Sequence, residues 1–171
     1  AQRPIEERAL QVVNGTVGEA LGQLYVEEKF PAEAKEKAKE MIEYVFLAFE
    51  NRINNLPWMT KATKANAIAK IHKTNVKIGY PDKWKDYSSL VIDPSLSYWE
   101  NIKRASAWYT ADNLADLGKE VDRTRWFMSP QTVNAYYNPT TNEICFPAAI
   151  LQPPFYNSAA DDAVNYGAIG V

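Results

Sequence analysis

A single histidine and a single cysteine limit the chemistry that this sequence can perform. A protein zinc site needs three or four ligands at characteristic spacing, and His72 stands alone on an expected helix, so we interpret it as a structural or surface residue. Cys145 alternates with apolar neighbours and lies at no expected helix terminus, which is typical of an inert strand residue rather than a reactive thiolate. The residues by themselves therefore predict no catalytic group and no metal ligand in this chain.

Asp161 and Asp162 are neighbouring carboxylates that could be considered for acid–base chemistry. Adjacent residues on a helix point in different directions, so the two groups would not converge on one substrate atom. An aspartate directly before a helix can accept hydrogen bonds from its free N–H groups. We therefore expect one of the two to cap a helix that begins at Ala163.

A β-hairpin is predicted in the last third of the chain. Side chains alternate between two faces over residues 133–137, which is the period of a strand. Residues 138–142 are a cluster of turn formers, and residues 143–146 have the pattern of a returning strand. The proline that follows has no N–H to donate and should end this second strand.

Asn134 and Ala135 could form a peptide-binding edge within the first of these strands. An extended peptide can add to a free strand through main-chain hydrogen bonds. The Asn134 amide can donate and accept, and the small Ala135 side chain lets a ligand backbone lie close. An ordinary hairpin that covers a core is the alternative, and the alternating pattern alone is compatible with both.

The segment after the hairpin is apolar but irregular. Residues 148–156 are interrupted by Pro153 and Pro154, so they can form neither a long helix nor a central strand. Apolar segments of this kind must be held by neighbouring elements, and they often line pockets.

The charge balance excludes some classes of partner. The chain has 171 residues, 46% of them hydrophobic, and a net charge of -2, which gives no electrostatic case for nucleic acid. No run of residues is long and apolar enough for a membrane span, and one cysteine allows no internal disulfide. All Lys and Arg residues lie at or before Arg125, so we expect the remainder to be mostly buried or covered by something else.

Apolar periodicity predicts a mainly α protein with a small antiparallel β-hairpin. Gly15, Gly18 and Gly22 form a stripe of small residues on the first helix, which we interpret as a surface for close packing. Thr60 is expected to cap the third helix and Gly118 to end the fourth. The expected helices span residues 6–28, 32–54, 61–74 and 96–117, with a short strand at 76–80.

Several longer motifs resemble the neprilysin and endothelin-converting-enzyme family of zinc metallopeptidases, and the chain looks most like its bacterial members. The resemblance covers essentially the whole chain in the order of the family, which makes it far more specific than one short motif. The motifs are VNAYY at 133–137, FPA at 146–148, ILQPPF at 150–155 and NYGAIG at 165–170, with upstream matches at 18–26, 58–60, 78–82 and 126–131.

The resemblance implies a fragment of a two-domain, zinc-dependent endopeptidase that cleaves oligopeptides. Residues 1–125 would be a mostly helical region, part of the domain that caps the cleft together with connecting helices, and 126–171 the start of the catalytic domain. In this family two histidines and a glutamate activating water lie in an H-E-x-x-H helix, and a later glutamate completes the zinc site. We expect this helix to follow residue 171, so the chain would hold no zinc ligand and be inactive alone.

The resemblance also assigns substrate-binding roles to individual residues. Asn134 and Ala135 match residues that hydrogen-bond the substrate main chain beside the zinc. Ile150 and Phe155 match residues that line the hydrophobic pocket for the side chain after the scissile bond. Val171 falls where the next wall residue of that pocket is commonly Met, which is a change between two apolar residues.

The expected partners are an oligopeptide substrate and the missing catalytic part of the same protein. An exposed apolar patch at Ile150, Phe155 and Ile169 could also cause a dimer without biological meaning. The sequence does not determine the compartment, although the resemblance favours an extracytoplasmic one. A non-catalytic peptide-binding or scaffold module, or a protease-trimmed structural core, are the alternatives.

Overall fold

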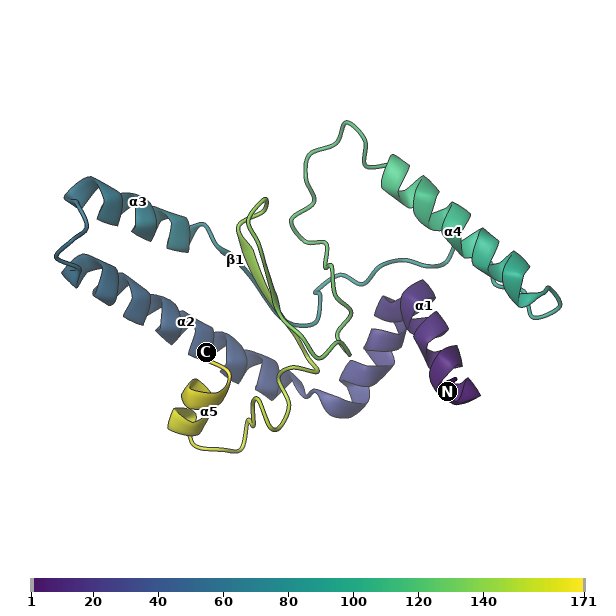
Figure 1. Cartoon of the computed structure of the whole chain (residues 1–171), viewed down its shortest axis with the longest axis horizontal. Coiled ribbons are helices and arrows are strands. Elements are labelled where there is room, and N and C mark those ends of the chain that lie inside the picture. Colours follow the sequence, from purple (N-terminus) through teal and green to yellow (C-terminus); the bar gives the residue numbers. More distant parts are fainter. Residues whose placement is uncertain (1, 171) are drawn as a thin grey trace.

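The protein is described by a computed structural model that covers residues 2–170. These residues form five helices and one three-stranded sheet, so the expectation of a mainly α chain with a small β-hairpin is confirmed. The sheet lies at the centre, with α2 and α3 extending to one side and α1 and α4 on the other (Figure 1). No helix within residues 2–170 combines the length and apolar character that a membrane crossing requires.

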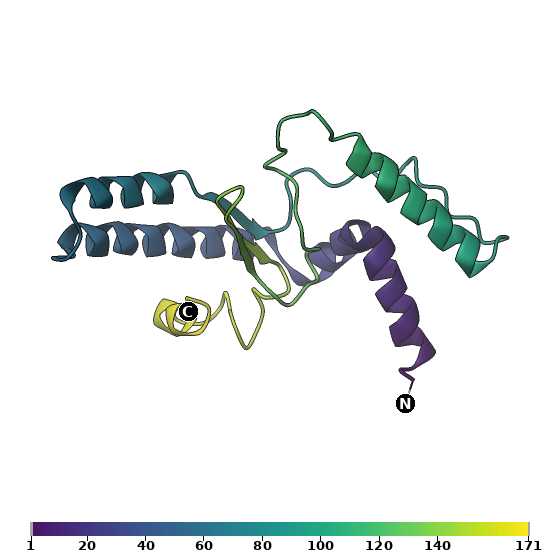
Figure 2. The same cartoon turned by 45° about the horizontal axis from the view of Figure 1, so that its top comes forward.

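The first three helices lie close to their expected positions. They are α1 (Ile5–Lys29), α2 (Ala32–Asn55) and α3 (Lys61–His72). α1 is kinked at Val17, whose backbone angles are not helical. The expected cap of α3 is confirmed, because the Thr60 hydroxyl accepts a hydrogen bond from the Thr63 N–H at 3.2 Å. In both views α3 runs alongside α2 (Figure 1, Figure 2).

The fourth helix is shorter than the sequence indicated. α4 (Tyr98–Leu114) begins after a capping box in which Ser97 accepts from the Glu100 N–H and Glu100 accepts from the Ser97 N–H. This reciprocal pair satisfies two end groups and sets the start two residues later than predicted. Gly118 has a φ of 76°, a conformation that glycine adopts without strain, and it lies in the turn that follows.

The predicted hairpin is confirmed, and a third strand joins it. β2 (Tyr136–Asn138) pairs antiparallel with β3 (Glu143–Pro147), while β1 (Asn75–Gly79) pairs parallel with β3 on its other side. The strand order is therefore β1-β3-β2, with β2 at an edge. The prediction of a strand from residue 133 was wrong, since β2 begins three residues later.

The core lies where α2, the sheet and the segment after β3 meet. Phe30, Ala38 and Met41 pack there with Ile78 and Leu151, all of them buried. Apolar side chains towards the end of α2 are less covered, and Phe49 remains 52% exposed. The charge-poor final segment is likewise only partly buried.

The glycine stripe on α1 packs against residues 129–131. A Cβ atom at Gly18 would lie 2.6 Å from Ser129 Oγ, and one at Gly22 would lie 2.6 Å from Pro130 Cδ. The close approach predicted for these two glycines is therefore present, with an irregular segment as the partner. Gly15 has no such neighbour within 4 Å, so its inclusion in the packing surface was wrong.

Of the three residues of the predicted exposed apolar patch, only Phe155 is exposed. Ile150 and Ile169 are partly buried and pack against the core, while Phe155 is 42% exposed.

The final helix, α5 (Asp162–Ala168), is capped as expected by Asp161, whose carboxylate accepts from the Ala163 N–H at 2.9 Å.

Candidate functional site

Asn134 and Ala135, here called the edge dipeptide, directly precede β2 at the open edge of the sheet. The side chain of Asn134 is exposed, and its Oδ1 accepts a hydrogen bond from the Ala135 N–H at 2.8 Å. The Asn134 N–H donates to the Thr132 carbonyl at 3.0 Å. If the β2–β3 register continued, Asn134 would face Pro147, which has no N–H to donate. This explains why the ladder ends before the edge dipeptide.

The chain just before the edge dipeptide is anchored to α1 and to the segment after β3. The Gln131 side-chain amide donates to Asn14 Oδ1 at 2.7 Å and to the Gly18 carbonyl at 2.8 Å. The Ala149 N–H donates to the Pro130 carbonyl at 2.8 Å. These contacts, together with the glycine packing described above, hold residues 130–131 in place.

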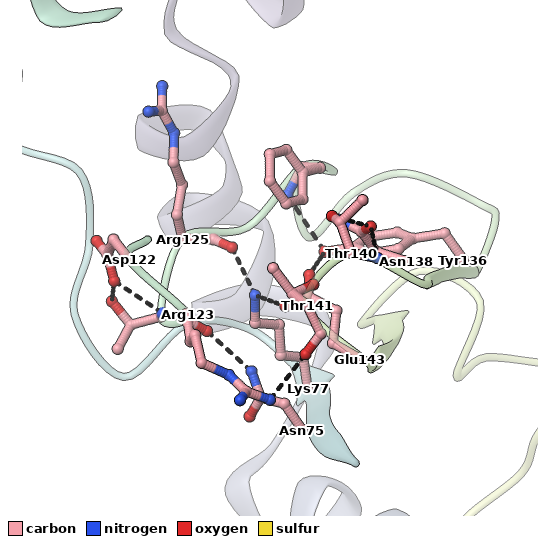
Figure 3. Close-up of polar contacts among 12 residues, drawn as sticks. Asn75, Lys77, Asp122, Arg123, Arg125, Tyr136, Asn138, Thr140, Thr141 and Glu143 are labelled. Carbon is pink, nitrogen blue, oxygen red and sulfur yellow. Dashed lines mark hydrogen bonds and ion pairs between the residues drawn. The ribbon is translucent and has the colours of Figure 1, made fainter. Parts of the chain in front are cut away.

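The chain just after the edge dipeptide is anchored by a buried cluster formed by Lys77, Tyr136 and Glu143 (Figure 3). Lys77 Nζ donates to Glu143 Oε2 at 2.9 Å, and the Tyr136 hydroxyl donates to Glu143 Oε1 at 3.0 Å. Glu143 is fully buried and Lys77 is 6% exposed. Lys77 of β1 and Tyr136 of β2 therefore both bond the carboxylate of Glu143 in β3.

The electrostatics of the buried cluster favour an ionised Glu143. Burial alone would raise the pKa of this carboxyl, but hydrogen bonds from Lys77 and Tyr136 outweigh it, so its pKa lies below the usual value. Burial also raises the pKa of the Tyr136 hydroxyl, and the hydrogen bond to Glu143 adds to that shift. Tyr136 is consequently a neutral donor at physiological pH.

The two pocket residues predicted in the described part of the chain lie in the turns after β3. Ile150 is half-buried against the core, and its N–H donates to the Pro147 carbonyl at 3.2 Å. The Phe155 ring is more exposed, and its N–H donates to the Gln152 carbonyl at 3.0 Å. Val171 lies outside the described residues. The edge dipeptide and these two residues thus belong to separate segments on either side of β3.

Residues 2–170 bring together no group of three or more His, Cys, Asp or Glu side chains able to hold a metal ion. His72 lies at the surface, where its Nε2 is 2.6 Å from Glu50 Oε1, in agreement with a structural or surface role. Cys145 is fully buried, and burial raises the pKa of its thiol to about 12, which agrees with an inert strand residue. The residues present do not fit a zinc site.

Two pockets of the described structure lie away from the predicted site residues. One of about 610 Å³ is lined by α1, residues 81–87, α4 and residues 122–129. The other, of about 500 Å³, lies between α2 and residues 156–166. Neither is lined by the edge dipeptide, Ile150 or Phe155.

Sequence reasoning missed the buried cluster, although a signal was present. Glu143 is the one charged residue in the sequence from 132 to 156, and it stands within an apolar strand pattern. Lys77 stands in a second short strand in the same way. A lone charge in each of two strands indicates a buried pair, because an unpaired buried charge is very costly.

Solved structures place this fold among the zinc metalloproteases. The crystal structure of Mycobacterium tuberculosis zinc metalloprotease Zmp1 in complex with inhibitor superimposes with a TM-score of 0.89 and 46% identity, over 99% of this chain and 25% of that one. PepO from Lactobacillus rhamnosis superimposes with a TM-score of 0.90 and 34% identity, over 96% of this chain and 26% of that one.

Sequence comparisons identify the family. Two family models, both described as "Peptidase family M13", match residues 1–81 and 134–171. Neprilysin-3 of Drosophila melanogaster is 40% identical over 92% of this chain and 21% of its own length, and Neutral endopeptidase of Lactobacillus helveticus is 39% identical over 96% and 26%. The chain belongs to peptidase family M13, which confirms the resemblance predicted from its motifs. It spans about a quarter of the length of these relatives.

Proposed function

We propose that the full-length protein is a zinc-dependent endopeptidase that cleaves oligopeptides. The edge dipeptide would hydrogen-bond the substrate main chain, and Ile150, Phe155 and Val171 would line the pocket for the side chain after the scissile bond. The observation that carries this proposal is the open edge of β2, with an exposed asparagine two residues before its first residue in a chain of family M13.

The main chain around the edge dipeptide is suited to strand addition. Peptides add to sheet edges through main-chain hydrogen bonds, and the order β1-β3-β2 leaves the outer side of β2 without a strand among the described residues. The Asn134 carboxamide now closes on its own neighbour, so substrate binding would exchange that short local contact for contacts with a peptide bond.

The zinc and its ligands are proposed to come from other parts of the same protein. Because residues 2–170 hold no suitable ligand group, this chain would contribute substrate alignment and no metal-assisted step. The division into a cleft-capping region at 1–125 and the start of the catalytic domain at 126–171 is part of this proposal. The extracytoplasmic location stays a prediction.

Replacement of Asn134 by Ala in the full-length protein tests the proposal. The variant should lose about 1–3 kcal/mol of transition-state stabilisation, because a peptide group in the cleft would lack its hydrogen-bond partner. The measurement is kcat/KM with a quenched fluorescent peptide. Asn55→Ala, which removes an exposed amide at the end of α2, should leave kcat/KM unchanged. An Asn134→Ala enzyme as efficient as the wild type would refute the role of the edge dipeptide.

A further inference from the structure

The buried cluster has no part in the proposed function so far, yet it lies next to the edge dipeptide. Tyr136 begins β2 and directly follows Ala135 in the sequence. Its hydroxyl donates to Glu143 Oε1 and also accepts from the Phe127 N–H at 3.4 Å. The Phe127 ring packs edge-on against the Tyr136 ring, with centroids 6.1 Å apart. The first residue of β2 is thus fixed through its side chain.

The cluster also fixes the segment that leads towards the edge dipeptide. Lys77 Nζ donates to the Arg125 carbonyl at 2.5 Å as well as to Glu143 (Figure 3). The Asn75 side chain donates to the Arg123 carbonyl at 2.8 Å, so residues 123–125 are tied to β1 at two points. The cluster therefore joins three strands and the incoming chain.

The edge dipeptide depends on these anchors because it has little support of its own. The Thr132 N–H donates to the Ser129 carbonyl at 3.0 Å, while the hydrogen bonds of Asn134 and Ala135 are formed within residues 132–135. The β2–β3 ladder starts only at Tyr136, opposite Cys145. The edge dipeptide is therefore held in place mainly by the anchored residues on either side of it, residues 130–131 and Tyr136. Tyr136 directly follows Ala135 and is two residues from Asn134, so a shift of its backbone would displace the edge dipeptide directly.

Stability alone does not account for a charged pair at this place. Burying Lys77 and Glu143 costs desolvation, and well-packed apolar residues often stabilise a protein equally well or better. The Glu143 carboxylate fixes the relative orientation of two neighbouring strands, because it accepts one hydrogen bond from each of them.

We propose that the buried cluster positions the edge dipeptide for substrate, with Tyr136 as the positioning residue that transmits its orientation. This inference rests on the proposed function. Tyr136 does not touch the peptide in this arrangement, and its hydroxyl acts on catalysis through the direction in which Asn134 faces the substrate.

A double-substitution cycle in the full-length enzyme tests the inference. Tyr136→Phe removes the hydroxyl and keeps the ring, and should lower kcat/KM by about 10-fold, the size expected for one hydrogen bond to a buried charge. In an Asn134→Ala background the same substitution should change kcat/KM by less than about 2-fold, because the group it orients is gone. Rates are compared per mole of folded enzyme, well below the unfolding temperature.

Tyr137→Phe is the matched control. It removes the neighbouring hydroxyl of the same strand, which is exposed and bonds Asn142 Oδ1 at 3.1 Å, and it should leave kcat/KM unchanged. If Tyr136→Phe does not fold, Phe127→Leu removes the edge-on ring contact at a residue that is 60% exposed, and should show the same coupling to Asn134→Ala.

The possible outcomes separate the two proposals. An unchanged kcat/KM for Asn134→Ala overturns the proposed function. A reduced kcat/KM for Asn134→Ala combined with no effect of Tyr136→Phe overturns the positioning inference alone. The positioning inference is also overturned if the effects of Asn134→Ala and Tyr136→Phe on kcat/KM are fully additive. It is overturned as well if Tyr137→Phe lowers kcat/KM as much as Tyr136→Phe, because a general structural role would produce either result.

Discussion

Lys77 and Glu143 are two charged residues that orient neighbouring strands, although burying them costs desolvation. Each brings a charge into the sheet interior, and their 2.9 Å contact lets the two charges compensate. Sequence analysis predicted Asn134 and Ala135 as site residues from their types and from family motifs, but it did not single out Lys77. Each of the two strands carries a lone charge, but which strand lies beside which is a property of the folded sheet, so the sequence analysis did not pair Lys77 with Glu143.

At the residue scale we predict a specific acid sensitivity. The pKa of Glu143 in the folded protein lies below its ordinary value of 4.5, so its stabilising contribution is complete above pH 4.5 and disappears as the pH falls through the folded value. Chemical denaturation at neutral pH and near pH 3 measures this loss. The Lys77→Met/Glu143→Leu double variant should lose less stability on acidification, and an equal loss would contradict the assignment.

At the element scale, patterns with a local cause were predicted well. Thr60 and Asp161 cap α3 and α5 as expected, because a capping side chain acts on N–H groups two or three residues away. The start of β2 was predicted less well, since it depends on Pro147 across the sheet. The parallel pairing of β1 with β3 was not predicted, because the register joins Asn75 with Glu143 far along the chain.

The packing of α1 against residues 129–131 gives a second prediction. Gly22→Ala should destabilise the protein by about 1–3 kcal/mol, because the new methyl group would lie 2.6 Å from the fully buried Pro130 ring. Gly15→Ala has open space and should be neutral or stabilise by up to about 1 kcal/mol through helix propensity. Thermal unfolding of both variants measures the difference, and equal melting temperatures would rule out the tight contact.

At the scale of the whole molecule, large apolar side chains remain exposed on several elements. Tyr98 and Trp99 on α4 are each 66% exposed, and Trp58 between α2 and α3 is 72% exposed. The uneven charge distribution led us to expect that the part after Arg125 is mostly buried or covered by something else, but Phe127, Val133 and Val164 in that part are also at least 60% exposed. The composition of a chain determines how much apolar surface it has, and the arrangement of its helices and strands determines where that surface stays exposed.

We predict that the 171-residue chain alone does not hydrolyse peptides, since the described residues offer no metal-binding group. The assay uses a quenched peptide, with and without added zinc, beside the full-length protein as a positive control. Turnover by the chain alone that a chelator abolishes would contradict this prediction.

The parallel pairing of β1 with β3 has a consequence for biosynthesis. Lys77 precedes its partner Glu143 by 66 residues, all of which the ribosome must translate first. At ~5–20 residues per second, this delay is about 3–13 s. During this interval β1 lacks its partner β3, while α2 and α3, which pack against each other, can already assemble. The pairing of β1 with β3 is therefore expected to follow the assembly of α2 and α3 in the nascent chain.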